Sequence, residues 1–385
     1  MSMKRLLSAL SVSLLLAGTA RHARAAGAEP FNFLFLDGNA RAVAMGGAYT
    51  ALAGDANALL YNPGGLAWVD GHEATFMHNQ HFEGITQEYL GFASRSGFGA
   101  LLNYVDYGSL TRTTISNPDG SGDFGASDLA LGGGYGRRFA EDFGVGGALK
   151  LIRGSIDGTN AQGYAADFGV LYRSAELQGL KLGAALQNLG PSVKFERNDE
   201  NLPLNLRFGG AFDFAVRERP VVLALDMTKE RSEGLLVNIG AEMRPVELFA
   251  LRLGYATRNE AGPGVSVGFG VGKKGFGFDY AFVPFGDLGN THRMSLTLRW
   301  GNGELKSYAA APEPRRRPVE RAAAVAPAAP PASKPLASPA PRPVPELKAL
   351  PVVPAPAVPA EAPAPKPAAS KPTPSARPSN GDISE

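Results

Sequence analysis

The stretch FGFDYAFVPFGDLGNTHRMSLTLRW, residues 276–300, decides the fold class of this chain. Aromatic residues occupy every second position from Phe276 to Phe282, and small or acidic residues lie between them. The same period returns from Met294 to Trp300, where apolar residues alternate with Arg, Ser and Thr. Successive side chains of a β-strand point to opposite faces of its sheet. Each run therefore predicts a strand with one apolar and one polar or small face.

This alternation recurs between His72 and Trp300 in segments of roughly ten residues. Strands of soluble sandwiches average about 5–6 residues, whereas about 9–11 residues cross a bilayer as a tilted barrel strand. We therefore predict an all-β fold, a transmembrane antiparallel barrel of about 14 strands, whose even number places both ends on one side. The predicted strands cover residues 72–82, 86–95, 97–107, 127–139, 142–154, 162–173, 179–189, 204–216, 220–228, 234–244, 248–258, 264–272, 275–284 and 292–300.

The connections between these strands predict how the barrel is oriented. Long connections at residues 108–127 and 190–203 alternate with tight ones, such as Ser96–Gly97. Outer-membrane barrels have long extracellular loops and short periplasmic turns, so we expect both ends of the barrel to be periplasmic. Trp68 and Trp300 would then lie at the periplasmic interface, because indole rings favour the headgroup layer.

The N-terminus has the features of a secretory signal over residues 1–25. Lys4 and Arg5 precede an apolar run, and Ala23-Arg24-Ala25 offers a cleavage site. A second cleavage site near Ala20 and a retained anchor are the alternatives. The chain has no cysteine, which excludes a lipid-modified cysteine and a disulfide framework.

The C-terminal segment, residues 302–385, is predicted to be a disordered periplasmic tail. From residue 311 onward it contains 21 of the 30 prolines, with 10 Lys/Arg against 6 Asp/Glu. Such a composition cannot form a packed core. One interpretation is that the tail is a tether that contacts peptidoglycan or an inner-membrane partner. The alternative is that it is an unselected spacer. No basic patch with interleaved aromatic residues marks the folded part, so we expect no nucleic-acid binding.

Residues 26–71 precede the barrel and are too small and too rich in Gly and Ala for a separate domain. We expect a short helix over residues 40–53, interrupted at Gly46–Gly47, and a second over residues 56–60 with Asp55 as its N-cap. Asn62-Pro63-Gly64-Gly65 predicts a turn.

Two blocks of sequence resemble a known group of proteins. Residues 40–67, ARAVAMGGAYTALAGDANALLYNPGGLA, resemble the N-terminal signature of the PorV/PorQ family and, more distantly, of the FadL family of outer-membrane transport barrels. Residues 185–212, ALQNLGPSVKFERNDENLPLNLRFGGAF, resemble the Asn-Leu-Gly and Leu-Pro-x-x-x-Arg-x-Gly arrangement of PorV/PorQ-type proteins. Two features depart from the pattern: Gly64 stands where these families usually have Ala, and the aromatic-ended last strand is followed by the long tail.

The resemblance implies that residues 26–71 form a plug, or hatch, inside the lumen. By the resemblance, Asn62, Pro63 and Gly64 are hatch residues, and Met45, Gly46 and Gly47 pack beside them. The alternative is that Asn62–Gly65 is only a turn leading into the first strand.

Three functions remain open for an outer-membrane protein in contact with lipid. The first, which the resemblance favours, is a transport barrel whose hatch admits small hydrophobic molecules. The second is a PorV-like component that handles secreted proteins. The third is a structural anchor that joins the outer membrane to the cell wall through the basic tail.

Catalytic and metal chemistry are not expected. Alternation places His72 and His78 on one face of the first predicted strand and His81 on the other. We therefore do not expect the three side chains to converge on one metal ion. The sequence lacks a motif that pairs a nucleophile with a base. The Gly-rich run at residues 131–136 lacks the strand, loop and helix order of a phosphate-binding loop. We expect no enzymatic activity and no cofactor.

Overall fold

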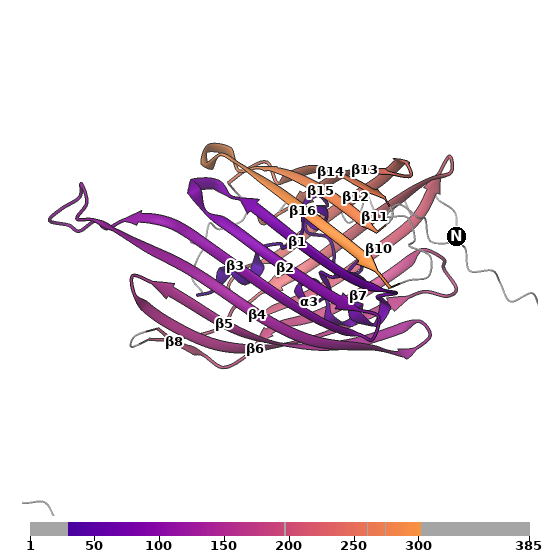
Figure 1. The fold of residues 1–385 in the computed structure, drawn as a ribbon, viewed down its shortest axis with the longest axis horizontal. Helices are drawn as coiled ribbons and strands as arrows, with labels where there is room; N and C mark the ends of the chain where they lie inside the picture. The colour runs from indigo at the N-terminus through magenta and orange to yellow at the C-terminus, as the bar shows by residue number, and fades with distance from the viewer. Residues whose placement is uncertain (1–29, 196–197, 260, 274, 302–385) are drawn as a thin grey trace, which may run out of the picture. The chain divides into compact units, whose positions relative to one another are not determined.

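The computed structural model describes residues 30–301, except residues 196–197, 260 and 274. The predicted signal segment and the predicted tail therefore lie outside the described residues. Within the described part, the chain forms a closed antiparallel β-barrel of fourteen strands (Figure 1), which confirms the predicted fold class. No helix in the described part is long and apolar enough to span a bilayer.

Neighbouring strands along the chain pair with each other, and β1 closes the barrel against β16, where His72 lies opposite Trp300. The barrel strands are β1 His72–Gln80, β2 Thr86–Ser94, β3 Phe98–Thr111, β4 Asp123–Ala140, β5 Phe143–Ile156, β6 Thr159–Arg173, β7 Leu180–Leu189, β10 Asn205–Val216, β11 Arg219–Glu230, β12 Leu235–Val246, β13 Phe249–Ala256, β14 Val265–Lys273, β15 Phe276–Pro284 and β16 Asn290–Trp300.

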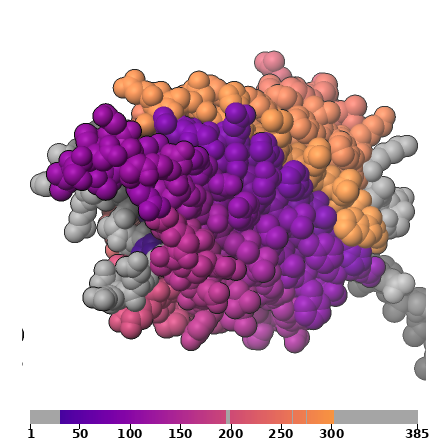
Figure 2. Space-filling view, turned by 60° about the vertical axis from the view of Figure 1, so that its left-hand side comes forward, coloured from indigo at the N-terminus to yellow at the C-terminus, as the bar shows by residue number. Residues whose placement is uncertain are grey.

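The predicted strands agree with these bounds except in the two long connections. β3 and β4 extend well into the predicted loop 108–127, because they go on pairing with each other after their other neighbours end. The resulting hairpin projects from the barrel (Figures 1 and 2). The predicted loop 190–203 contains a small second sheet, formed by β8 Val193–Phe195 and β9 Asn198–Glu200.

The two faces of the barrel wall differ as the alternation predicts. On β16, Leu296 and Leu298 are 44% and 54% exposed on the outer face, whereas Ser295 and Thr297 are buried toward the lumen. Large apolar side chains are exposed in the same way on the other barrel strands. A closed barrel with an apolar outer band and a polar interior is the structure of an outer-membrane barrel.

The segment before β1 lies inside this barrel, in contact with strands around the wall. We call residues 30–71 the plug. It contains η1 Asn32–Phe35, α2 Ala40–Ala44, α3 Ala58–Tyr61 and η2 Pro63–Trp68; two further short helices, η3 Phe82–Gly84 and η4 Gly286–Leu288, lie in loops.

The helices of the plug are shorter than predicted. α2 ends before Gly46, and the backbone N–H groups of Tyr49 and Thr50 donate to the Asp226 carboxylate on the wall instead of continuing the helix. Asp55 is not the N-cap of α3, because that helix begins only at Ala58. Its carboxylate instead accepts hydrogen bonds from Asn57 N and the Tyr49 hydroxyl.

Candidate functional site: the plug in the barrel lumen

The plug packs against glycines on the inner face of the wall. A Cβ atom on Gly169 would lie 2.1 Å from Oδ1 of Asn62, and one on Gly146 would lie 2.2 Å from the carbonyl oxygen of Pro63. Only glycine permits so close an approach of two backbones. On further inward glycines, an added Cβ atom would lie 2.0–2.7 Å from an atom of the plug: Gly91, Gly134, Gly183, Gly209, Gly240, Gly254 and Gly268. The wall is therefore shaped to receive the plug along many of its strands.

Asn62 joins two parts of the plug to the wall. Its Nδ2 donates to the carbonyl oxygen of Thr50 at 3.0 Å and to that of Val170 on β6 at 2.8 Å. Its Oδ1 accepts from Gly64 N at 3.1 Å, which caps η2, and Pro63 occupies the first turn of that helix. The predicted turn is thus the start of a 3₁₀-helix.

Met45, Gly46 and Gly47 form the end of α2 and lie against a different part of the wall. Both glycines have positive φ, 65° and 77°, in the left-handed region that favours glycine. Gly46 N donates to Ser266 Oγ on β14 at 3.2 Å, and Arg207 Nη2 on β10 donates to the Gly47 carbonyl at 2.8 Å. These contacts seat the chain reversal after α2 on the wall.

Asp226 on β11 is a second polar contact between wall and plug. Its Oδ2 accepts hydrogen bonds from Tyr49 N, Thr50 N and Thr50 Oγ1, at 3.1, 3.0 and 2.6 Å. Arg207 lies 2.9 Å from the same oxygen. Asp226 is only 1% exposed, so its charge is balanced inside the lumen by hydrogen bonds and by a guanidinium group.

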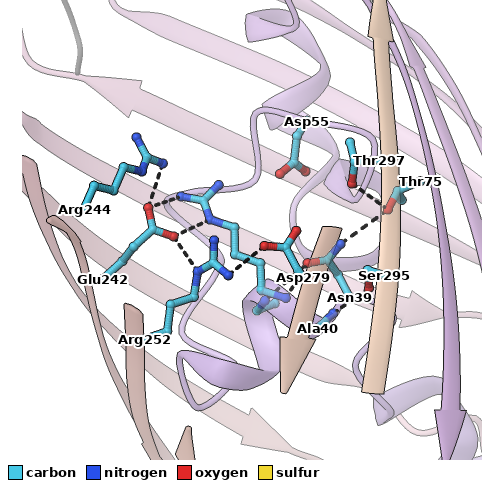
Figure 3. A network of polar contacts seen from close by, with 12 residues as sticks. Asn39, Ala40, Asp55, Thr75, Glu242, Arg244, Arg252, Asp279, Ser295 and Thr297 are labelled. Atoms are coloured by element: carbon cyan, nitrogen blue, oxygen red, sulfur yellow. Dashed lines mark hydrogen bonds and ion pairs between the residues drawn. The ribbon is translucent and has the colours of Figure 1, made fainter. Parts of the chain in front are cut away.

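The largest charged cluster is centred on Glu242 of β12 (Figure 3). Arg41 of the plug, and Arg244 and Arg252 of the wall, contact its carboxylate at 2.8, 2.7 and 2.7 Å. Arg252 continues the cluster to Asp279 on β15, also at 2.7 Å. The Glu242 side chain has no exposed surface. One buried carboxylate therefore links the plug to two strands of the wall.

Uncharged contacts extend this interface to β1 and β16 (Figure 3). Asn39 Oδ1 caps α2, and Asn39 Nδ2 donates to Thr75 Oγ1 at 3.4 Å. Ala40 N donates to Ser295 Oγ at 2.9 Å, and the hydroxyls of Thr75 and Thr297 lie 3.2 Å apart. The first turn of α2 thus contacts the strands that close the barrel.

Two buried tyrosines connect the parts of the plug. The Tyr49 hydroxyl donates to Asp55, and the Tyr61 hydroxyl donates to Asp37 Oδ1 at 2.8 Å. Their rings are 5.1 Å apart. Burial raises the pKa of both hydroxyls well above the ordinary value, and it outweighs the opposing charge of Arg41 at Tyr49. Both therefore remain neutral hydrogen-bond donors.

A cavity of about 60 Å³ remains between the plug and strands β7 and β10–β13. Polar and apolar side chains line it, and four polar atoms around it have no hydrogen-bond partner among the described residues: Asn205 Oδ1, Thr228 Oγ1, Glu230 Oε2 and Asn238 Oδ1. A cavity of this size takes about four to six water molecules, whereas sites for drug-sized ligands occupy roughly 300–1,000 Å³. The cavity suits water and not an apolar ligand.

An apolar cluster lies elsewhere in the lumen, beneath the first turn of the plug. Phe31, Phe33 and Leu34 pack on small and branched apolar residues of β3–β6, among them Val105 and Ile152, and all of these are buried. This part of the inner wall is therefore apolar, unlike the polar wall around Glu242. It is covered by the plug.

The two tryptophans occupy different environments, which corrects the predicted interface belt for Trp68. Trp68 is 3% exposed and lies between the guanidinium groups of Arg138 and Arg173, at 4.4 and 4.3 Å from its ring centre. The η2 helix turns it into the barrel, so it does not reach lipid. Trp300 is 45% exposed on the outer face and stacks on His72 at 5.8 Å. Its interfacial role stays a prediction.

The histidines do not converge. His78 lies on the outer face, 2.6 Å from Glu88, whereas His81 packs against Phe82 and Phe285 in the loop after β1. Burial, with the charge of Arg293, lowers the pKa of His81 to about 3. In the described part of the chain, no three His, Asp or Glu side chains lie together as metal ligands would.

The six predicted hatch residues all belong to the plug but not to one site. Asn62, Pro63 and Gly64 lie against β5 and β6, whereas Met45, Gly46 and Gly47 lie against β12–β14. Their role in gating stays a prediction. Sequence reasoning missed the charged wall residues that contact the plug, Asp226 and Glu242 above all. A usable signal was present, since both are charged residues at inward positions of alternating strands.

Comparisons with known proteins give one family and several distant structures. The family model of the type IX secretion system protein PorV matches residues 19–231, more than half of the chain. The Pseudomonas putida toluene transporter TodX has 14% identity and a TM-score of 0.46, over 68% of this chain and 96% of that chain. The CymD monoaromatic hydrocarbon channel has 12% identity and a TM-score of 0.49, over 71% of this chain and 99% of that chain. A Pseudomonas aeruginosa FadL homologue has 11% identity and a TM-score of 0.43, over 66% of this chain and 96% of that chain. None of the curated proteins matches this chain.

Proposed function

The chain belongs to the family of the type IX secretion system protein PorV, and we propose that it handles secreted proteins at the outer membrane as part of such a system. Membership in a family of secretion-system proteins agrees with the expectation that the chain is not an enzyme. The observation that carries the proposal is the family match. The geometry of the lumen and of the projecting hairpin adds support.

The closed lumen supports a role outside the barrel. The plug contacts the wall through buried ion pairs and close backbone packing, and the cavity beside it is about 60 Å³. A polypeptide does not fit into such a space. Protein cargo would then be handled at the rim of the barrel and not be threaded through it.

The β3–β4 hairpin supports a polypeptide as the partner. β3 pairs with β2 only as far as Asp106, and β4 pairs with β5 only from Ala126. Between these points the two strands pair with each other, and β4 has one further backbone contact, from Asp157 N to the Gly125 carbonyl at 3.1 Å. Free strand edges can pair with a strand of another protein. Ile115, near the tip of the hairpin, is fully exposed.

We expect removal of this hairpin to impair secretion without unfolding the barrel. Residues 109–125 would be replaced by an Asn-Gly turn, which suits a tight hairpin. In the bacterium that encodes the chain, the variant should lower the surface and supernatant levels of proteins exported across the outer membrane by about tenfold, as loss of an interface hot spot does. These proteins should accumulate in the periplasm and be measured by quantitative mass spectrometry of each fraction.

The control for this experiment is a shortened loop 231–234, which lies at the same end of the barrel. Both variants should reach the outer membrane at the wild-type level. Deletion of the whole gene provides the reference for complete loss. Unchanged protein export in the deletion strain would rule out the secretion role itself, whereas unchanged export in the hairpin variant alone would rule out only the hairpin as the contact.

A second candidate function is the uptake of small hydrophobic molecules, which the apolar cluster favours. If the first turn of the plug moved, Val105, Ile152 and their neighbours would form an apolar binding wall. Phe33→Asp would place a charge in this cluster and displace the turn. Under this function, the variant should bind a medium-chain fatty acid measurably in calorimetry, and wild type should carry such a molecule in native mass spectrometry. Absence of binding to both proteins would exclude this candidate.

The orientation of the barrel and the role of the tail are part of the same proposal. The tight turns lie on the side where β1 begins and β16 ends, and this side is periplasmic if the usual loop rule holds. The signal segment 1–25, the plug 26–71, the barrel 72–301 and the tail 302–385 remain our division of the chain. A contact of the tail with peptidoglycan or the inner membrane would be excluded if a chain lacking residues 311–385 cofractionated and functioned like wild type.

A further inference from the structure

An open pocket of about 480 Å³ lies at the tight-turn end of the barrel, on the side away from the projecting hairpin. It is formed by the turn between β2 and β3, the last residues of β4 and the end of the plug. Its charged lining residues are Asp70, Arg95, Arg137 and Arg138. Three positive charges and one negative charge thus surround a space of about 480 Å³, against about 60 Å³ for the cavity inside the lumen.

The arginines of this pocket are available to a ligand. Neither Arg95 nor Arg137 lies within ion-pair or hydrogen-bond distance of another side chain among the described residues, and both are exposed. Arg138 donates from Nε to the Ala67 carbonyl at 3.3 Å and lies over the Trp68 ring. Its guanidinium is therefore fixed in position while its charge has no counter-ion in the described part. A planar guanidinium with free N–H groups recognises carboxylate and phosphate groups.

The surroundings of the pocket place it at the membrane surface. Phe98 and Tyr135, whose rings are 4.9 Å apart, are 60% and 44% exposed on the outer face, and Phe139 beside Arg138 is 82% exposed. On the same end of the barrel, Trp300 and Phe92 lie 6.2 Å apart. Aromatic side chains mark the interfaces of outer-membrane barrels. The arginines therefore lie next to the lipid-facing aromatic residues, at the end of the barrel where the lipid headgroups would be.

We propose that this arginine pocket, formed by Arg95, Arg137 and Arg138, binds the phosphate group of an anionic phospholipid in the leaflet at the tight-turn end. The guanidinium groups bind the headgroup phosphate, and the acyl chains lie along Phe98 and Tyr135. Because Arg138 also contacts Trp68 and Ala67, a bound lipid touches the base of the plug. This inference concerns a site outside the lumen and does not depend on the nature of the cargo.

The experiment uses the purified full chain in detergent and titrates lipids in native mass spectrometry. Wild type should bind phosphatidylglycerol about tenfold more tightly than phosphatidylcholine, because the choline cation of the zwitterionic lipid offsets its phosphate charge, whereas phosphatidylglycerol keeps a net negative charge. Arg95→Gln combined with Arg137→Gln should weaken phosphatidylglycerol binding by about tenfold and remove most of its preference over phosphatidylcholine. Both residues are exposed, so the variant should fold normally.

The matched control is Arg217→Gln combined with Arg219→Gln, two exposed arginines at the tight turn between β10 and β11. It should bind phosphatidylglycerol like wild type. Equal binding of the two lipids, or equal loss in both double variants, would overturn the proposal, because binding would then follow acyl chains or total charge. Displacement of the lipid by inorganic phosphate at comparable concentration would also overturn it, since the pocket would then be a site for soluble anions.

Discussion

Glu242→Ala should release the plug more strongly than any other single substitution of a wall residue. The Glu242 carboxylate contacts Arg41, Arg244 and Arg252 at 2.7–2.8 Å, and its side chain is fully buried. Removal of one partner from a buried ion pair costs about 3–5 kcal/mol, because the remaining charge stays buried without compensation. Arg252 keeps Asp279, but Arg41 of the plug loses its ion pair with Glu242.

The position of the plug can be followed with a thiol probe, because the chain has no cysteine of its own. Ala48→Cys places a thiol at a residue with no exposed surface. Loss of the ion pair should lower the free energy that keeps the plug in the lumen by roughly 3 kcal/mol. The rate of maleimide labelling should then rise on the order of 100-fold. Labelling is measured by mass spectrometry on the folded protein in detergent.

Glu247→Ala is the control for charge removal, since Glu247 lies exposed in the turn after β12. Its labelling rate should equal that of the parent. Glu242→Gln should give an intermediate rate, because the amide keeps the shape and one acceptor oxygen but loses the charge and places an NH2 donor beside the guanidinium groups. If Glu242→Ala labels at the parent rate, the ion pairs do not contribute to seating of the plug.

Gly146→Ala should displace the plug by a steric mechanism. The added methyl carbon would lie 2.2 Å from the Pro63 carbonyl oxygen and 2.5 Å from its carbon. Both atoms belong to the backbone, so no side-chain rotation relieves the contact. Overpacking of this kind costs typically about 1–3 kcal/mol, which corresponds to roughly 5- to 150-fold faster labelling of the Ala48→Cys thiol.

The neighbouring Gly147→Ala is a matched control on the same strand. Gly147 faces outward, and its added carbon would lie no closer than 3.5 Å to the nearest atom, an ordinary contact. Its effect on stability should stay within about 0.5 kcal/mol. Similar labelling of the two variants would show that the contact between β5 and Pro63 is not required for seating, and would contradict the role of the glycines.

Much of the barrel was predictable because the pattern that specifies a membrane strand is local. The outward side chains face lipid and must be apolar, while the inward ones face the lumen, so alternation from Phe276 to Phe282 is enough to recognise a strand and its two faces. The even strand count and the difference between long and tight connections followed from the same pattern.

The extension of β3 and β4 was not predictable in this way. Beyond Asp106, β3 pairs only with β4, and this hairpin projects from the barrel (Figure 1). Residues there no longer separate a lipid face from a luminal face, so the alternation is lost although the strands continue.

The local structure of the plug was predicted less well, because it depends on contacts with residues distant in the sequence. Local rules predicted Asp55 as a helix cap, yet Asp55 binds the Tyr49 hydroxyl. The predicted helix does not resume after Gly46–Gly47, because Asp226 of the wall binds the backbone N–H groups of Tyr49 and Thr50. The interfacial prediction for Trp68 failed for the same kind of reason, since Arg138 and Arg173 of the wall enclose its ring.

By itself, the sequence determined the barrel, the approximate number of its strands, the two faces of each strand and the presence of an N-terminal segment unsuited to a domain of its own. Only the tertiary structure decided which inward glycines receive that segment and which buried charges contact it. Strand alternation reflects the solvent on each side of a residue, whereas the contacts of the plug form only when the barrel closes, so close to the wall that a Cβ atom on an inward glycine would lie within 3 Å of the plug.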